Sequence, residues 1–205
     1  HALKQFTHSP PSVYANRLEN INEFSNSMID FITNAAKSKI KVYCKPFNPV
    51  TVYLMADTYR SMGEIGGDFF ECSDRFDKGM NYDLLETCSM VLWDQPGTGF
   101  MECIASGIPT MILWAPYYKE EKWCEEDFIS LEEAGVIHRT SQLLVKEIQQ
   151  FLIDPSAWIN DSNRKAVIQN FSDKYALSDD KWWKSWRTYL KHLKYELKLN
   201  IETTN

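Results

Sequence analysis

Short apolar runs alternate along the chain with segments whose apolar residues recur at helical spacing. The runs at 90–93 and 110–114 are continuous in apolar residues, which is typical of parallel strands covered on both faces. We predict strands at 2–6, 40–44, 69–72, 90–93, 110–114 and 135–138. We predict helices between them at 18–32, 52–62, 82–88, 99–106 and 125–134. From Ser141 the pattern is helical through Lys198.

A strand and a helix repeat about six times, which predicts an α/β fold. We expect a Rossmann-like parallel sheet of about six strands, with helices on both faces and a helical C-terminal tail. The length of 205 residues fits one domain with a real core. We place that domain at 1–180, a closing amphipathic helix at 181–199 and a disordered tail at 200–205. A flavodoxin-like or response-regulator-like domain is less favoured, because the loop "THSPPS" offers no clear acidic or phosphate-binding set.

Charge and cysteine usage limit the partners and the compartment. A net charge of −6 and a pI near 5.3 argue against nucleic acid as a partner, because phosphate-backbone binding needs a basic surface. Five cysteines without metal-ligand spacing indicate buried thiols in a reducing compartment. We expect a cytoplasmic protein. The abrupt start at His1 suggests either the edge of a larger protein or a remnant of expression cloning.

The segment "WDQPGTGFMECIA", residues 93–105, joins a predicted strand to a predicted helix. In an open parallel sheet, ligands bind beyond the carboxyl ends of the strands, where such loops lead into helices. Gly97 and Gly99 would let the backbone approach a ligand closely, and Thr98 could cap the helix or donate its hydroxyl. The first N–H groups of the helix would then suit phosphate. The segment matches neither a P-loop nor GxGxxG, since it lacks the lysine and the third glycine.

Two carboxylates of this segment each have two interpretations. Glu102 could accept hydrogen bonds from sugar hydroxyls, or it could complete a capping box with Thr98 or Gly99. Asp94 could bind a hydroxyl or a metal, while an Asx-turn that opens the loop is at least as well supported. The spacing alone does not decide between them.

Three stretches carry a family resemblance. They are "VLWDQPGTGFMECIASGIPTMILWAPYY" from residue 91, "LEEAGVIH" from 131 and "FSDKYALSDDKWWKSWRTYL" from 171. Together they resemble the C-terminal half of sugar transferases encoded in bacterial surface-polysaccharide loci. The resemblance runs from about Ser9 to Leu193 and is most specific at 94–110 and 175–186. That family is similar to GT-B glycosyltransferases and, more distantly, to CDP-glycerol glycerophosphotransferases of teichoic acid synthesis.

The resemblance implies a nucleotide-sugar-binding role for 1–180. GT-B enzymes pair a C-terminal donor-binding domain with an N-terminal acceptor domain, and only the former is visible here. Carried over, Gly97, Thr98 and Gly99 cradle the donor's diphosphate, and Glu102 holds the ribose or the sugar. Lys45 lies where relatives have a strand-end cation, although a solvated lysine is slightly favoured. The implied partner is a nucleotide sugar, with neither a cofactor nor a metal.

Group transfer also needs a base for the acceptor hydroxyl, and the sequence offers little for that role. GT-B enzymes often keep the base on the acceptor domain. His8 is the weak candidate within this chain, and a plain loop histidine is the favoured interpretation. Ala115 stands where relatives often carry aspartate. The function implied is a glycosyltransferase acting on a surface-polysaccharide or lipid-linked acceptor; the alternative is a non-catalytic Rossmann-like binding or scaffolding module.

The C-terminal segment is amphipathic and basic. Its aromatic and apolar stripe consists of Trp182, Trp186, Tyr189, Leu190, Leu193 and Leu197. Six basic residues and one acidic residue between 181 and 198 give it a charge of +5, which leaves −11 for the rest. Such a helix could contact the inner face of an anionic membrane. Packing against protein, including the absent acceptor domain, is favoured.

Overall fold

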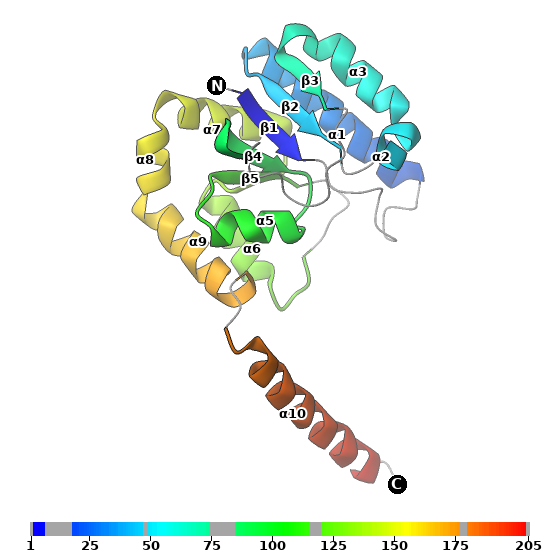
Figure 1. The fold of residues 1–205 in the computed structure, drawn as a ribbon, viewed down its shortest axis with the longest axis vertical. Coiled ribbons are helices and arrows are strands. Elements are labelled where there is room, and N and C mark those ends of the chain that lie inside the picture. Colours follow the sequence, from blue (N-terminus) through cyan, green and yellow to red (C-terminus); the bar gives the residue numbers. More distant parts are fainter. Residues whose placement is uncertain are drawn as a thin grey trace.

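The computed structural model describes residues 2–6, 18–46, 49–73, 85–114, 120–176 and 180–203. Figure 1 shows these residues as one α/β body from which a single long helix projects. The helix that projects is the C-terminal one.

A parallel sheet lies at the centre of the body. Its strands are β1 (Ala2–Phe6), β2 (Val42–Lys45), β3 (Phe70–Cys72), β4 (Cys88–Trp93), β5 (Thr110–Leu113) and β6 (Ile137–His138). Their order is β3-β2-β1-β4-β5-β6, and every neighbouring pair is parallel. Successive strands therefore proceed outward from β1 in one direction and then, from β4, in the other. The predicted α/β, Rossmann-like parallel sheet is confirmed.

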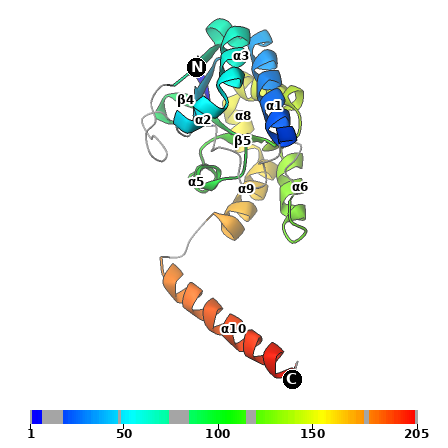
Figure 2. The same cartoon turned by 90° about the vertical axis from the view of Figure 1, so that its right-hand side faces the viewer.

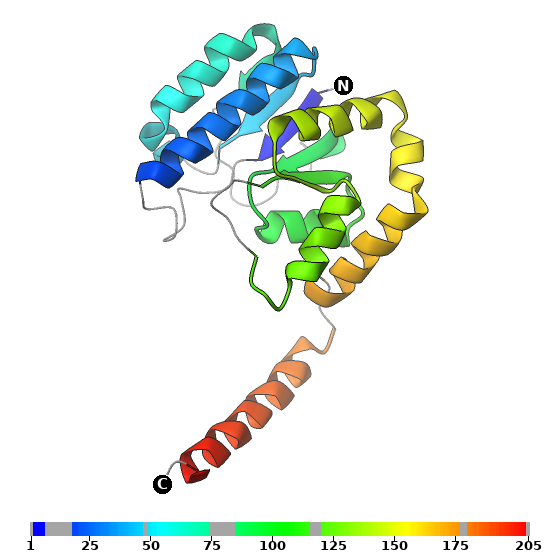
Figure 3. The ribbon, with the colours of Figure 1, turned by 180° about the vertical axis from the view of Figure 1, so that it is seen from behind.

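Helices cover both faces of the sheet. Neighbouring residues of β4 point to opposite faces, so Met90 and Leu92 join one core cluster, whereas Val91 and Trp93 join the other. The first face carries α1 (Leu18–Lys37), α3 (Ala56–Gly66), α7 (Ser141–Ile153) and α8 (Pro155–Asn160). The second face carries α5 (Thr98–Ala105), α6 (Glu125–Glu133) and α9 (Ser162–Tyr175). Seen from behind, α1 and α7 lie over the sheet (Figure 3).

Two predicted helices differ from the structure. The helix expected at 52–62 is divided into α2 (Pro49–Leu54) and α3, with buried Met55 between them. Apolar spacing continues across this break, which is why the pattern predicts one helix. The helix expected at 82–88 is wrong at Cys88, which begins β4 and pairs with Ala2. Residues 82–84 lie outside the described residues.

Helix α10 (Trp182–Thr203) extends away from the body (Figures 1 and 2). The tail predicted at 200–205 is therefore helical as far as Thr203, because no glycine or proline interrupts the segment. Trp182, Trp183 and Trp186 are each at least half exposed. The members of the predicted stripe whose side chains the structure describes, Trp182, Trp186, Tyr189 and Leu190, are thus exposed. No helix among the described residues is long and apolar enough to cross a membrane.

Ending the chain after Asp180 is expected to leave the stability of the body unchanged. Because the aromatic side chains of α10 are exposed, their removal takes away little buried surface, and the midpoint of thermal unfolding should shift by less than about 2 °C. Circular dichroism at 222 nm during heating measures this midpoint. As a control, ending the chain after Asp161 also removes α9 with its buried Phe171 and should abolish cooperative unfolding. A large fall in the midpoint after the first truncation would contradict the arrangement of α10.

Candidate functional site

The loop between β4 and α5, residues 94–97, lies at the point where the strand order reverses. β4 neighbours β1, and the chain leaves β4 at its carboxyl end after Trp93. In open α/β sheets this is where ligands bind, because the loops from the two halves of the sheet diverge there. We call residues 94–99 the switch-point loop. It contains four of the six predicted donor-binding residues: Asp94, Gly97, Thr98 and Gly99.

Helix α5 begins without a side-chain cap. Its N-cap residue is Gly97, which has extended backbone angles (φ −86°, ψ −177°), and Thr98 is the first helical residue. The prediction that Thr98 caps the helix is therefore wrong. The amides of the first turn face the carboxyl edge of the sheet, together with the positive end of the helix dipole. An anion at this edge would be stabilised by both.

Position 99 is occupied by glycine because the Trp93 ring fills the space that a side chain would need. A Cβ atom at this position would lie 2.8 Å from Cζ3 and 2.9 Å from Cζ2 of Trp93, and still closer to Cη2. Both residues are buried in the second core cluster or beside it. The sequence predicts that the missing side chain makes room for a ligand; the structure shows that Trp93 fills that room. The N–H group of Gly99 still belongs to the first turn of α5.

Glu102 lies on the exposed side of α5. It is the fifth residue of the helix and shares that side with Thr98, one turn earlier, whereas Gly99, Phe100 and Cys103 are buried. A capping box would place its glutamate at the third helical position, which is occupied by Phe100. The capping-box interpretation is therefore wrong. The role of Glu102 in binding a sugar or ribose stays a prediction.

Lys45 is buried, with 7% of its surface exposed, so the interpretation as a solvated lysine is wrong. It is the last residue of β2. This strand is paired with β3 along one edge and with β1 along the other. Lys45 and Trp93 are both register partners of Phe6, which puts them roughly 10 Å apart, on either side of β1. Val42 faces the first core cluster, so alternation turns Lys45 toward the face that carries Trp93 and α5.

Asp94 follows Trp93 directly and is 2% exposed. A carboxylate this deeply buried is held by its surroundings and cannot be a solvated loop side chain. Among the described residues, no three His, Cys, Asp or Glu side chains group together as a metal site. The choice between an Asx-turn and a ligand contact for Asp94 stays a prediction.

The structure thus brings five predicted residues to one edge of the sheet: Lys45, Asp94, Gly97, Thr98 and Gly99. Glu102 follows one turn along α5. His8 and Ala115 lie outside the described residues.

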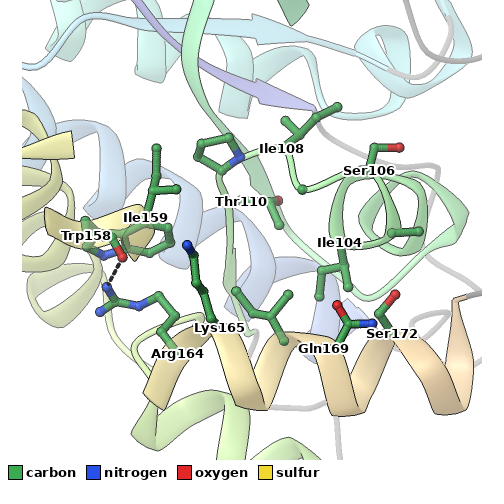
Figure 4. A pocket seen from close by; sticks show the side chains of 14 residues that line it. Ile104, Ser106, Ile108, Thr110, Trp158, Ile159, Arg164, Lys165, Gln169 and Ser172 are labelled. Atoms are coloured by element: carbon green, nitrogen blue, oxygen red, sulfur yellow. Dashed lines mark hydrogen bonds between the residues drawn. The ribbon is translucent and has the colours of Figure 1, made fainter. Parts of the chain in front are cut away.

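A cavity of about 460 Å³ lies at the opposite edge of the sheet (Figure 4). It is bounded by the turn before β5, by α8 and by α9. Side chains of Ile104, Ile108 and Ile168 make much of the wall, and Lys165 and Gln169 add polar groups from α9. Because β5 begins at Thr110 on this wall, the cavity and the switch-point loop are separated by the length of the strands. No motif or spacing in the sequence predicts this cavity.

Arg164 closes one side of this cavity as part of a structural network. Its Nε atom donates to the Ala134 carbonyl (2.7 Å), Nη1 to the Trp158 carbonyl (2.8 Å) and Nη2 to Glu147 Oε1 (2.8 Å). The Trp158 indole N–H donates to the same Glu147 oxygen at 2.7 Å, and the guanidinium lies 4.0 Å from the centre of the Trp158 ring. Burial lowers the pKa of Arg164. These contacts join the end of α6 to α7, α8 and α9.

His138 is likewise structural. It ends β6, is buried, and its Nε2 lies 3.0 Å from the Gly135 carbonyl oxygen, so it donates there as the neutral ring. Burial lowers the pKa of His138, which keeps the ring neutral at pH 7. Because the ring is buried and its Nε2 is engaged by the Gly135 carbonyl, His138 serves the fold.

Several solved structures resemble the chain distantly. A UDP-GlcNAc 2-epimerase from Neisseria meningitidis has 13% identity and a TM-score of 0.44, with 84% of this chain and 43% of the epimerase covered. An O-GlcNAc transferase from Thermobaculum terrenum has 14% identity and a TM-score of 0.40, with 85% and 35% covered. A molybdenum cofactor carrier protein from Chlamydomonas reinhardtii has 12% identity and a TM-score of 0.46, with 75% and 100% covered. The chain thus spans less than half of the epimerase and the transferase, and these likenesses are too distant to bear on activity.

Sequence families give a firmer result. No curated protein sequence matches the chain. The model of the LIC12162 family transferases matches residues 15–190, which is most of the chain and includes β2 to β6 and the switch-point loop. The chain therefore belongs to the LIC12162 family of transferases.

Proposed function

We propose that this chain is the donor-binding part of a GT-B type glycosyltransferase. It would help to move a sugar, or a related group, from a nucleotide-activated donor to a surface-polysaccharide or lipid-linked acceptor. The observation that carries the proposal is the uncapped start of α5 at the reversal of strand order, in a chain of a transferase family.

In this proposal the first amides of α5 bind the donor's diphosphate. Negative charge builds up on the diphosphate as it leaves, and the amides of residues 98–100 and the helix dipole stabilise that charge. Lys45 adds a cation on the same face of the sheet, and Asp94 holds the loop or accepts from a donor hydroxyl. Glu102, exposed one turn further on, accepts hydrogen bonds from the ribose or the sugar. No metal or cofactor enters this scheme.

The base for the acceptor hydroxyl would lie on an N-terminal acceptor domain that is not part of this chain. The exposed aromatic stripe of α10 is proposed to pack on that domain. The other partner that we consider is an anionic membrane at the cytoplasmic face, because the segment 181–198 carries six basic residues and one acidic residue. Co-sedimentation with anionic and with neutral vesicles separates these two partners.

Isothermal titration of the chain with UDP, GDP, CDP and CMP tests the donor site. CDP is included because of the distant resemblance to CDP-glycerol glycerophosphotransferases. We expect one nucleoside diphosphate to bind, and Glu102→Gln and Lys45→Met each to weaken it by about tenfold, which corresponds to about 1.4 kcal/mol. Glu64→Gln, at an exposed position of α3 over the other face of the sheet, is the matched control and should leave affinity unchanged. A folded chain that binds none of the four ligands would contradict the proposal.

That negative result would favour the second candidate, a non-catalytic binding or scaffolding module of the same fold. Ala115, where relatives often carry aspartate, is the sequence feature that favours it. Substitutions of Glu102 and Lys45 would then have no effect on nucleotide binding, because the chain itself would bind no nucleotide.

A further inference from the structure

Two cysteines are direct neighbours on adjacent strands. Cys44 of β2 and Cys72 of β3 are register partners in a parallel pair, so their side chains point to the same face of the sheet. Adjacent strands are about 4.8 Å apart, which lies within the Cα separations that disulfides span. A disulfide also needs the Cβ atoms somewhat closer than a flat pair holds them. β3 has three residues and lies at the edge of the sheet, paired on one side only, so its end can make that small shift.

The two thiols are differently accessible. Cys72 is exposed at the end of β3, whereas Cys44 is fully buried. The hydrogen bond from the Cys44 thiol lowers the pKa of Cys72, which favours the thiolate at the exposed position. The Ser73 amide donates to the Cys44 carbonyl at 2.8 Å, and this bond holds the two strand ends together just beyond the pair.

The other cysteines lack this combination. Cys103 is buried, and burial raises its pKa to about 12. Cys124 is buried and its thiol donates to the Glu121 carbonyl at 3.2 Å, while the thiol of partly buried Cys88 donates to the Leu85 carbonyl at 3.3 Å. The Cys72 thiol also faces a carbonyl, that of Ser73, but at the longer distance of 3.9 Å. Reactive cysteines are accessible, are ionised more readily than usual and have a second thiol beside them. Among the five cysteines, Cys72 fits that description.

We infer that Cys44 and Cys72 form a site of reversible oxidation, in which Cys72 reacts first and Cys44 closes an intramolecular disulfide. With hydrogen peroxide as the oxidant, the Cys72 thiolate attacks one peroxide oxygen, the O–O bond breaks, and hydroxide leaves. The Cys44 sulfur then attacks the sulfenic sulfur of Cys72, the S–S bond forms, and the S–O bond breaks. The proton of Cys44 and a solvent proton convert the leaving hydroxides to water. Overall, two thiols and one peroxide give one disulfide and two waters, and a low-molecular-weight dithiol reverses the change.

This site does not depend on the proposed donor site. Cys44 nevertheless directly precedes Lys45, so the disulfide would cross-link β2 to β3 beside that lysine. Nucleotide affinity and thiol oxidation are measured separately, and failure of one leaves the other standing.

The test exposes the full chain to hydrogen peroxide, blocks remaining thiols with iodoacetamide and maps the peptides by mass spectrometry. We expect a Cys44–Cys72 cross-link that dithiothreitol removes, and modification of Cys72 at least about tenfold faster than that of Cys103 or Cys124.

In Cys44→Ser the sulfenic acid of Cys72 should persist and be trapped by dimedone. In Cys72→Ser the buried Cys44 should stay reduced, whereas the control Cys124→Ser should still form the cross-link. In urea the preference for Cys72 should disappear. Equal oxidation of all five thiols in the folded chain, or oxidised Cys72 without a cross-link to Cys44, would overturn the inference.

Discussion

Arg164→Ala is expected to destabilise the fold by about 3 kcal/mol, because it removes the charge that compensates a largely buried carboxylate. The Arg164 and Glu147 side chains are 14% and 17% exposed. Without Arg164, Glu147 keeps its bond from the Trp158 indole but loses its positive partner, and two backbone carbonyls lose a charged donor. The stacking on Trp158 is lost as well. Urea denaturation followed by circular dichroism measures the free energy of unfolding.

An exposed ion pair in the same chain provides the control. Arg60 and Asp57 form an ion pair one turn apart on α3, with most of both side chains in solvent. Arg60→Ala should therefore cost less than about 1 kcal/mol. In Arg164→Ala, adding Glu147→Gln should recover part of the stability, since glutamine still accepts from the Trp158 indole and carries no charge. A cost for Arg164→Ala as small as that for Arg60→Ala would show that the network does not hold α7, α8 and α9 together.

The fold class could be predicted because burial on both faces makes β4 and β5 nearly continuous apolar runs. The segments 90–93 and 110–114 contain such runs, and β4 and β5 form there. The bounds of the last strand are harder to predict. Of the strand predicted at 135–138, only Ile137 and His138 pair with β5. Gly135 instead ends the turn after α6 with φ +73°, in the left-handed region. A glycine followed by two apolar residues is equally typical of the start of a strand and of a turn.

The helical region after Ser141 shows a signal that apolar spacing misses. It consists of separate helices, and oxygen-bearing side chains start them. Thr140 accepts from the Leu143 amide at 3.4 Å, Asp154 from the Ala157 amide at 2.9 Å and Asp161 from the Arg164 amide at 2.7 Å. Each residue is a favoured N-cap type, and Asp154 precedes Pro155 at the first helical position. The caps could have been found in the sequence; the packing angle that brings Arg164 to Glu147 could not.

The location of the candidate site could be predicted from the sequence, whereas the contacts of its individual residues could not. A strand followed by closely spaced glycines predicts a loop at the carboxyl edge, and the structure puts residues 94–99 there. Which neighbour touches each residue depends on tertiary packing. The burial of Lys45 follows from the central position of β2, and the crowding at Gly99 follows from the direction of the Trp93 ring. Strand order and side-chain direction across a sheet leave no local pattern in the sequence.

Gly99→Ala is expected to destabilise the fold by about 1–3 kcal/mol, the usual cost of forcing extra volume into a packed core. The new methyl group would overlap the Trp93 ring, which is itself buried among the residues of the second core cluster. Gly63→Ala is the matched control, since Gly63 is also helical but has open space around its missing Cβ. That change should be neutral or stabilise by up to about 1 kcal/mol. Chemical denaturation of both variants gives the comparison.

A second substitution separates packing from ligand binding at Gly99. Trp93→Phe shortens the ring, so it should cost stability alone but recover part of it in the Gly99→Ala background, with a coupling energy of about 1 kcal/mol or more. If Gly99 were instead needed for the approach of a nucleotide, Gly99→Ala would unfold like the unmodified chain, lose nucleotide affinity, and show no coupling to Trp93→Phe. The proposed donor site requires only the Gly99 amide, which alanine retains. Residual affinity in the folded fraction of Gly99→Ala would therefore support binding through the α5 amides, while the loss of stability would assign the glycine itself to the core.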